Sequence, residues 1–321
     1  MRLSRLRVFL LPVCLFALVF VQQMIGQAAT PGPVRAYFPF IGTSPPTSTA
    51  TPTPITTPTP TATPVPASGY VHGTVGFDYS FPACGMPAPT TSSLGTRFSF
   101  AVVGVNDGRA FTLNPCLASE FQNAAAVVPL VSFYININAP IGSTAGNGLD
   151  GPRGHCASTD YGCQSYNYGY NAAQDAHTRA ATTLGSSTVA GRVWWLDVEM
   201  ANSWWGLDDH RCDSNCNDQV LQGAIDYVHQ IGQMVGAYSI SSMWTQSGPL
   251  QVATAMSGAQ SALILWSQIA GGYLPGVPAW VSGAANLTTA PGKCSSTSFT
   301  GGAVWLAQVP SPNYYDDDYA C

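Results

Sequence analysis

Two acidic residues, Asp197 and Glu199, follow directly on a run of bulky apolar residues at positions 193–196. In an extended strand alternate side chains share a face, so both carboxyl groups project together while Val198 points the other way. Burying a carboxyl group is unfavourable unless it is paired, hydrogen-bonded or neutral. We therefore predict that Asp197 and Glu199 form a catalytic acid/base pair; the alternative is a salt-bridged strand end.

Other carboxylates also stand where predicted strands end. Asp78 and Asp107 end the first and second strands, and Asp316, with Asp317 and Asp318 behind it, follows the last one. In parallel barrels the active site lies at the C-terminal ends of the strands. We expect these carboxylates to meet Asp197 and Glu199 on one rim, provided that the barrel closes in this order.

The elements that would position these residues alternate between strands and helices. The strand-like runs are residues 75–79, 98–105, 127–137, 193–198, 234–240, 262–268 and 303–309. Residues 171–184 are rich in alanine, and residues 218–231 place apolar side chains at helical spacing, with Asn217 or Asp218 as the cap. Strands that alternate with helices favour a mostly parallel sheet.

The length of the folded part fits this pattern. Residues 70–321 match the usual size of one (β/α) barrel. Helical signal fades over residues 271–302, so the last third of the barrel is expected to be irregular. We predict an α/β fold: an irregular TIM barrel, forming a single domain stabilised by disulfides.

The N-terminal part has the composition of an export signal and a spacer. Arginines precede an apolar stretch, and small residues follow it, which predicts a signal peptide over residues 1–29. The stretch is shorter than the ~20 residues that span a bilayer, so we expect no stable membrane insertion after cleavage. Residues 30–69, rich in proline and threonine, are predicted to form a disordered linker. The protein is expected to be secreted, with the linker holding the domain away from a surface such as that of the cell.

The cysteines favour disulfides over a metal site. Cys14 lies in the predicted signal peptide, and an even number remains after its removal, as in many exported proteins. Proximity in sequence favours the pairs Cys84 with Cys116, Cys156 with Cys163, Cys212 with Cys216, and Cys294 with Cys321. The histidines are scattered and no CxxC pair or HExxH motif occurs, so we expect no metal and no cofactor.

The charge balance limits the partners. The chain has 11 lysines and arginines against 16 aspartates and glutamates, and removal of the signal peptide makes it more acidic. Proteins that bind nucleic acids carry basic faces, so nucleic acid is not an expected partner. The mature protein is expected to be a monomer.

The motifs along the chain resemble those of the GH25-type glycoside hydrolases, the lysozyme-like muramidases, and especially their divergent secreted relatives. The family opens with Gly-x-Asp-x-Ser, carries Asp-x-Glu at the end of strand four, and continues with Gly-x-Tyr-Ser, Leu-Trp, Trp-x-x-Gln and a closing acidic motif. The counterparts, in the same order, are Gly76 to Ser80, Asp197 to Glu199, Gly236 to Ser239, Leu265-Trp266, Trp305 to Gln308 and Asp316 to Asp318.

This resemblance implies hydrolysis of a β-1,4 glycosidic bond in peptidoglycan. Glu199 would be the general acid, and Asp197 would stabilise the transition state or orient the N-acetyl group of the substrate. Asp78, Asp316 and Tyr238 would bind substrate. The family ends its second strand in Thr-Glu-Gly, where this chain has Asn106-Asp107-Gly108, so Asp107 would replace the glutamate with a shorter side chain.

Aromatic side chains near the predicted site have two interpretations. Trp204 and Trp205, and Tyr166, Tyr168 and Tyr170 in a glycine-rich insertion at residues 142–169, would stack on sugar rings or fill gaps between loops. Trp194 and Trp195 lie within a strand and are expected in the core.

Two other functions are compatible with the same residues. The barrel would serve as a non-catalytic extracellular carbohydrate-binding module if catalysis were lost. Alternatively it hydrolyses another extracellular glycan, which the acidic chain favours because an anionic protein is not attracted to an anionic wall.

Overall fold

The structure is a computed structural model that describes residues 69–199, 202–205, 216–240, 277–296 and 298–321. The chain divides into two units, Met1–Thr61 and Ala62–Cys321, and every described residue belongs to the second. The predicted signal peptide, nearly all of the predicted linker and the predicted strand at residues 262–268 lie outside the described residues.

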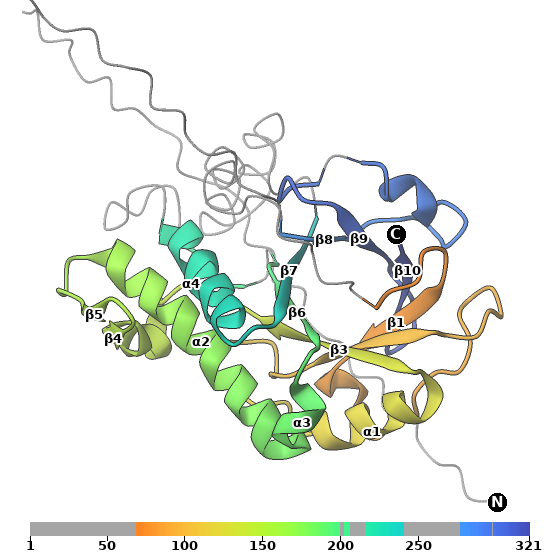
Figure 1. The fold of residues 1–321 in the computed structure, drawn as a ribbon, viewed down its shortest axis with the longest axis horizontal. Helices are drawn as coiled ribbons and strands as arrows, with labels where there is room; N and C mark the ends of the chain where they lie inside the picture. The colour runs from red at the N-terminus through yellow and green to blue at the C-terminus, as the bar shows by residue number, and fades with distance from the viewer. Residues whose placement is uncertain (1–68, 200–201, 206–215, 241–276, 297) are drawn as a thin grey trace, which may run out of the picture. The chain divides into compact units, whose positions relative to one another are not determined.

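Eight strands form a closed barrel in the order β1, β10, β9, β8, β7, β6, β3, β2 (Figure 1). Their bounds are β1 Val75–Tyr79, β2 Phe100–Gly104, β3 Leu130–Asn136, β6 Val193–Asp197, β7 Met234–Ser239, β8 Ala279–Val281, β9 Val304–Val309 and β10 Asp316–Ala320. Strand β10 is antiparallel to β1 and β9, and the other neighbours are parallel. The predicted α/β fold with an irregular barrel is confirmed.

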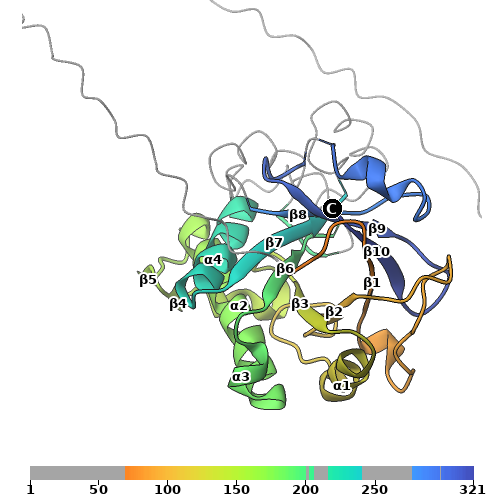
Figure 2. The same cartoon turned by 45° about the vertical axis from the view of Figure 1, so that its right-hand side comes forward.

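The helices follow the parallel strands. Helix α1 (Leu117–Val127) follows β2, α2 (Tyr161–Leu184) and the short α3 (Ser186–Val189) follow β3, and α4 (Cys216–Gln230) follows β6. Figures 1 and 2 show α2 and α4 packed side by side on one side of the barrel. The short 3₁₀ helices are η1 Phe81–Ala83, η2 Gly142–Gly148 and η4 Ala290–Lys293. In the described part of the chain no helix is long and apolar enough to cross a membrane.

Large rings fill the barrel interior. Trp195, Phe100 and Trp280 are almost fully buried there. A Cβ atom on Gly236 would lie 2.3 Å from the Trp195 ring, and one on Gly76 would lie 2.3 Å from the Phe100 ring. Both glycines belong to the motifs identified in the sequence, and each leaves room for the ring of its register partner on the adjacent strand.

Several predicted boundaries are wrong. Helix α2 begins at Tyr161 and not near Asn171. Asp160 caps this start by accepting a hydrogen bond from the Cys163 amide at 3.0 Å. The predicted cap Asn217 lies inside α4, and its side chain instead binds both backbone groups of Trp205. The start of α2 at Tyr161 was not predicted, because glycines and polar residues in its first turns resemble a loop.

Strands and a helix that lack a local signal were also missed. Strand β8 lies in the stretch that was predicted to be irregular, and residues 316–318 belong to β10 and do not follow the last strand. Helix α1 was not predicted, and its last residue, Val127, was assigned to the following strand. Aspartate is depleted in strands, so a run of three gives no strand signal; here the tertiary structure overrides that preference.

Three disulfides match the predicted pairs: Cys84 with Cys116, Cys156 with Cys163, and Cys294 with Cys321. Cys216 is also disulfide-bonded. Its predicted partner, Cys212, lies outside the described residues.

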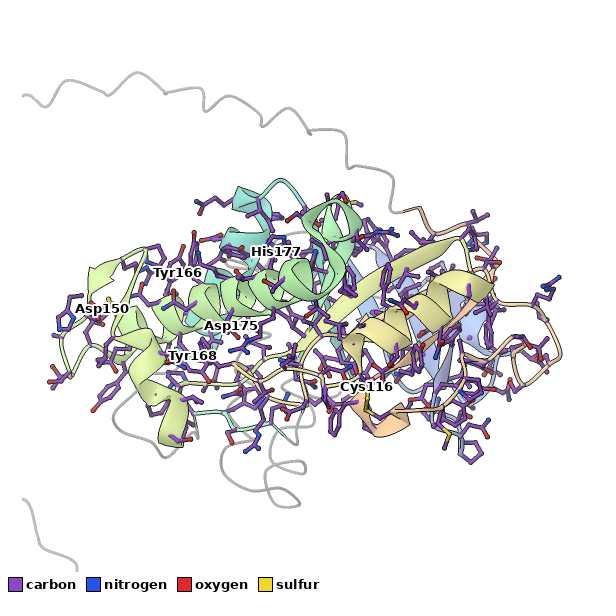
Figure 3. The ribbon with its side chains drawn as sticks, turned by 90° about the horizontal axis from the view of Figure 1, so that it is seen from below. Cys116, Asp150, Tyr166, Tyr168, Asp175 and His177 are labelled. Atoms are coloured by element: carbon purple, nitrogen blue, oxygen red, sulfur yellow. A yellow bond between two sulfur atoms is a disulfide. The ribbon has the colours of Figure 1, made fainter. Side chains whose placement is uncertain are left out.

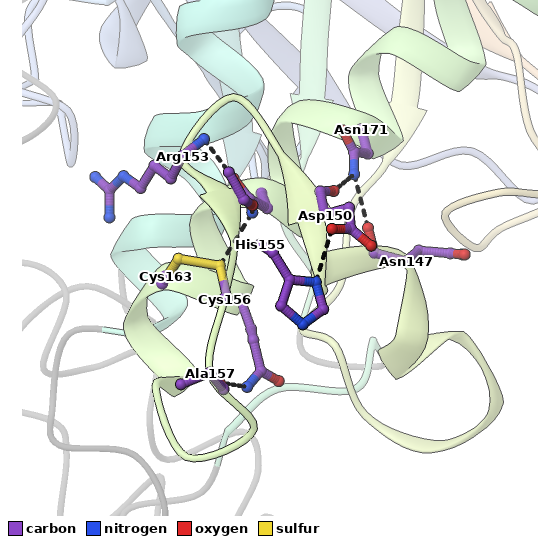
Figure 4. A network of polar contacts seen from close by, with 11 residues as sticks. Asn147, Asp150, Arg153, His155, Cys156, Ala157, Cys163 and Asn171 are labelled. Carbon is purple, nitrogen blue, oxygen red and sulfur yellow. Dashed lines mark hydrogen bonds and ion pairs between the residues drawn. A yellow bond between two sulfur atoms is a disulfide. The ribbon is translucent and has the colours of Figure 1, made fainter.

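The insertion after β3 is ordered against α2. It contains η2 and a small hairpin of β4 (Asp150–Gly151) and β5 (Gly154–His155). Figure 4 shows the Asp150–His155 contact of 2.8 Å, and Asn171 Nδ2 donating to the carbonyls of Asn147 and Asp150 at 2.7 Å each. These contacts tie the insertion to the helix that follows it.

Candidate active site

A hollow of about 270 Å³ opens at the C-terminal ends of the parallel strands. It brings together five residues predicted for the site from separate parts of the chain: Asp78, Asp197, Glu199, Tyr238 and Asp316. Its other lining residues are Ser80, Phe81, Gly108, Tyr134, Asn136, Trp280 and Gln308. Strand register explains the convergence, since Asp78 pairs with Asp316 across β1 and β10, while Asp197 pairs with Tyr238 across β6 and β7.

Asp197 is buried at the end of β6 and is held by an amide. Asn136, its register partner on β3, donates from Nδ2 to Asp197 Oδ2. Asn106 in turn fixes Asn136, because the two residues exchange side-chain and backbone hydrogen bonds of 2.9 and 3.0 Å. Burial raises the pKa of Asp197 well above its ordinary value, and the charges of Glu199 and Asp78 raise it further.

Glu199 is partly exposed to the hollow. Trp204 Nε1 donates to the Glu199 carbonyl oxygen at 3.0 Å and so fixes the backbone beyond β6. Burial raises the pKa of the Glu199 carboxyl, and the nearby charge of Asp316 adds to this. The side chain therefore holds a proton at a higher pH than an exposed glutamate does.

Asp78 is fixed by a glutamine whose orientation is determined by its neighbours. Gln308 Nε2 donates to Asp78 Oδ2 at 2.9 Å, while Gln308 Oε1 accepts from the hydroxyl groups of Tyr238 at 2.7 Å and Ser282 at 3.2 Å. Burial, followed by the charge of Asp316, raises the pKa of Asp78 to about 8. Burial is also the main cause that raises the pKa of Asp316 itself, whose Oδ1 accepts from the Ser311 amide.

Two tyrosines add hydroxyl groups to the hollow. Burial is the main cause that raises the pKa values of Tyr134 and Tyr238, and the charge of Asp197 adds to it in both cases. Both phenols are therefore neutral hydroxyl groups at neutral pH. Tyr134 was not predicted for the site, because within its strand it looks like an ordinary core aromatic.

Sequence analysis also missed the importance of Asp318, one of the deepest acids of the site. It is fully buried on β10, and Trp280 Nε1 donates to its Oδ1 at 2.8 Å. Burial raises its pKa well above the ordinary value, and the charge of Asp78 raises it further. The alternation of β10 is the signal that would have found it: Asp316 and Asp318 share one face, while Asp317 turns to the other and accepts from Ser93.

A second, larger hollow of about 570 Å³ adjoins the first, since both are lined by Gly108, Asn136 and Glu199. The predicted residue Asp107 lines this second hollow and not the first. Most of its remaining lining is uncharged: Ala110, Asn138, Ile141, Gly142, Ser143, Thr144, Asn202 and Ser203, with Arg109 as the charged exception.

The aromatic side chains that were predicted to stack on sugar rings or to fill gaps between loops do not form a stacking surface. Trp204 and Trp205 are 0% and 5% exposed, and the hydroxyl of fully buried Tyr168 contacts Asn138 and Thr144. Figure 3 shows Tyr166 and Tyr168 on α2; Tyr166 donates to Asp226 of α4 at 2.6 Å, and Tyr170 donates to Gln230 of the same helix. These side chains pack the helices and loops together, which was the second of the two interpretations.

The acidic side chains of the first hollow favour a reaction in which one carboxyl group donates a proton while a neighbouring one is negatively charged. Among the described residues that line the first hollow there is no lysine, arginine or histidine. Carboxyl groups that share a site without a cation cannot all ionise, so some retain protons at neutral pH. In the described part of the chain no group of three or more His, Cys, Asp or Glu side chains is arranged to hold a metal ion.

The chain is similar in structure to a bacterial autolysin. No family model matches the chain, and no curated protein sequence matches it. The modular autolysin LytC from Streptococcus pneumoniae matches with a TM-score of 0.43 and 12% sequence identity, over 77% of this chain and 46% of the autolysin. The same autolysin in complex with a synthetic peptidoglycan ligand matches with the same values. The chain thus spans about half of the length of the protein that it matches.

Proposed function

We propose that this protein is a secreted glycoside hydrolase that cleaves β-1,4 glycosidic bonds, with peptidoglycan as the substrate. The observation that carries the proposal is the position of Glu199, which lies with Asp197 and Asp316 in one hollow where burial raises the pKa of its carboxyl group. The order of the sequence motifs, which resembles that of the lysozyme-like muramidases, supports the same reaction.

In the proposed reaction Glu199 protonates the leaving glycosidic oxygen. The ring that loses this oxygen acquires positive charge in an oxocarbenium-like transition state. Asp197, which lines the same hollow, stabilises that charge or orients the N-acetyl group of the substrate. A water molecule then forms the new bond to the sugar carbon and gives its proton to a carboxylate of the hollow. Asp78, Asp316 and Tyr238 bind sugar hydroxyl groups, and the second hollow extends the site along the glycan.

The test compares the two glutamates of the chain. Glu199→Gln keeps the shape of the side chain but removes the acid, so we expect at least a 100-fold loss of activity, the usual size of general acid catalysis. The matched control is Glu120→Gln: Glu120 is buried in α1, accepts from Asn114 Nδ2 and lies outside both hollows. This control should remain active. The measurement is the release of reducing ends from purified peptidoglycan and from a panel of β-linked polysaccharides.

The same panel separates the alternatives. Release from neutral glycans but not from peptidoglycan would assign the enzyme to another extracellular polysaccharide, which the acidic lining of the first hollow favours. If wild type and Glu199→Gln both bind a glycan and neither releases ends, the hydrolase proposal fails. The barrel is then a carbohydrate-binding module.

A further inference from the structure

Asp318 and Asp78 meet inside the barrel although they lie at opposite ends of the folded chain. Strand β10 runs antiparallel to β1, with Asp318 opposite Gly76 and Asp316 opposite Asp78. Asp78 is therefore the diagonal neighbour of Asp318 on the same face of the two strands. The side chains of Asp318 and Asp78 lie within hydrogen-bond distance of each other.

Each carboxyl group of this pair accepts a hydrogen bond from one side-chain nitrogen. Asp318 Oδ1 accepts from Trp280 Nε1, and Asp318 Oδ2 has no nitrogen or hydroxyl donor among the described residues. Asp78 Oδ2 accepts from Gln308 Nε2. Gln308 cannot offer its oxygen instead, because that oxygen already accepts from Tyr238 and Ser282.

Two ionised carboxylates both accept hydrogen bonds and repel each other at this distance. The contact is stable when one of the two carries a proton. Each acid has one nitrogen donor, but Asp318 is 0% exposed, whereas Asp78 lines the hollow, where its charge is better solvated. We propose that Asp318 is held as a carboxylic acid that donates a hydrogen bond to Asp78, and that it acts as a positioning residue for the site.

The surrounding charges agree with this assignment. Asp316 on the same strand and Asp197 and Glu199 across the barrel are acidic, and Tyr70, Tyr134 and Tyr238 are neutral phenols. The hydrogen bond to Asp318 lowers the pKa of Asp78, while the bond to Asp78 raises that of Asp318, and both directions agree with a proton on Asp318.

The proton has two consequences for the proposed hydrolase. It holds the Asp78 carboxyl group between two donors, Asp318 and Gln308, and these two hydrogen bonds determine how that group faces the hollow. It also removes one negative charge from beside Asp78 and Asp316. These consequences rest on the proposed function, whereas the position of the proton does not.

The test uses two substitutions of Asp318 in the full mature chain. Asp318→Asn replaces the acid by an amide that still donates to Asp78 and still accepts from Trp280. Asp318→Ala removes both contacts. We expect Asp318→Ala to lower kcat/KM by about 10- to 100-fold, as for the loss of a hydrogen bond to a charged group. It should also raise the pKa of Asp78, and with it the acidic limb of the pH profile, because Asp78 loses a donor to its ionised form. Asp318→Asn should recover most of the lost activity.

A spectroscopic readout does not depend on catalysis. The infrared difference between wild type and Asp318→Asn at neutral pH should contain the C=O stretch of one protonated carboxyl group. Absence of this band, or an Asp318→Asn variant as impaired as Asp318→Ala, overturns the inference. If the band is present but wild type cleaves no glycan, the proton assignment holds and the proposed function fails. Should Asp318→Ala not fold, the infrared comparison still decides the question.

Discussion

Four carboxyl groups that line the first hollow, and Asp318 in contact with one of them, make the molecule sensitive to pH. Asp78, Asp197, Glu199, Asp316 and Asp318 all have raised pKa values, and burial is the largest cause for each. A raised pKa means that the folded state binds the proton more tightly than the unfolded chain does. The folded state is therefore penalised when these groups ionise.

We predict that the thermal unfolding midpoint falls as the pH rises from the ordinary pKa of Asp78 to its pKa in the folded protein. The pKa of this carboxyl is 3.8 ordinarily and about 8 in the folded protein. The stability that it contributes is complete below its unfolded pKa and is lost as the pH rises through its folded pKa. Asp78→Asn, which cannot ionise, should make the fall shallower when unfolding is followed by circular dichroism across a pH series.

The control for this prediction is Asp175→Asn on α2. Asp175 is bonded to Arg179 at 2.6 Å outside both hollows, and surface pairs of this kind contribute little to stability. Its substitution should leave the pH dependence as in wild type. An equal flattening in both variants would show that the buried carboxyl at position 78 is not responsible.

At the scale of elements, the contact between α2 and α4 depends on glycine. A Cβ atom on Gly169 would lie 1.7 Å from the Val220 carbonyl oxygen, and one on Gly223 would lie 2.0 Å from the Tyr166 carbonyl oxygen. The two helix backbones therefore touch at these points. Gly169, together with Gly162, also made the first turns of α2 resemble a loop in the sequence.

We predict that Gly169→Ala is destabilising by about 2 kcal/mol or more, because the helices must separate to admit one methyl group. Gly162→Ala in the same helix is the matched control, since its nearest neighbour would be an Asp160 oxygen at 3.8 Å. Alanine is favoured over glycine in helices by about 1 kcal/mol, so the control should be neutral or stabilising. Urea unfolding of both variants measures the difference, and equal destabilisation would contradict the proposed close contact.

At the scale of the whole molecule, the two ends of the folded chain close the barrel. Strand β10 pairs with β1, and the disulfide between Cys294 and Cys321 ties the end of β10 to the segment after η4. This closure places Asp316 and Asp318 beside Asp78. The active site therefore depends on contacts between distant parts of the chain.

We predict that this disulfide contributes more stability than the one in the insertion. The Cys294–Cys321 pair spans a sequence separation of 27 and the Cys156–Cys163 pair one of 7. Loop-closure entropy then gives about 3.5 kcal/mol for the first and about 2.4 kcal/mol for the second. Double Cys→Ser variants of each pair, unfolded in guanidinium chloride without reductant, should differ in this order. The reverse order would indicate that strain or residual structure outweighs the entropy of closure.

Much of the fold was predictable because its signals are local. Continuous apolar runs marked β6, β7 and β9, and the acids at strand ends pointed to the mouth of a parallel barrel. Strand β8 is short and β10 is acidic, so neither carries a local pattern. The two interpretations of Trp204 and Trp205 could not be separated from the sequence, because burial depends on tertiary contacts. Trp205, for example, meets Asn217 and Ser165 only after folding.

By itself the sequence determined that Asp197 and Glu199 share one face, since alternation along a strand is a property of the backbone. It also determined the type of barrel, because strands that alternate with helices pair in parallel. Only the tertiary structure decided that Asp318 contacts Asp78 and that Gln308 orients Asp78. Those contacts join residues from opposite ends of the folded chain, and strand register across a closing barrel is fixed by packing of the whole interior and not by any local pattern.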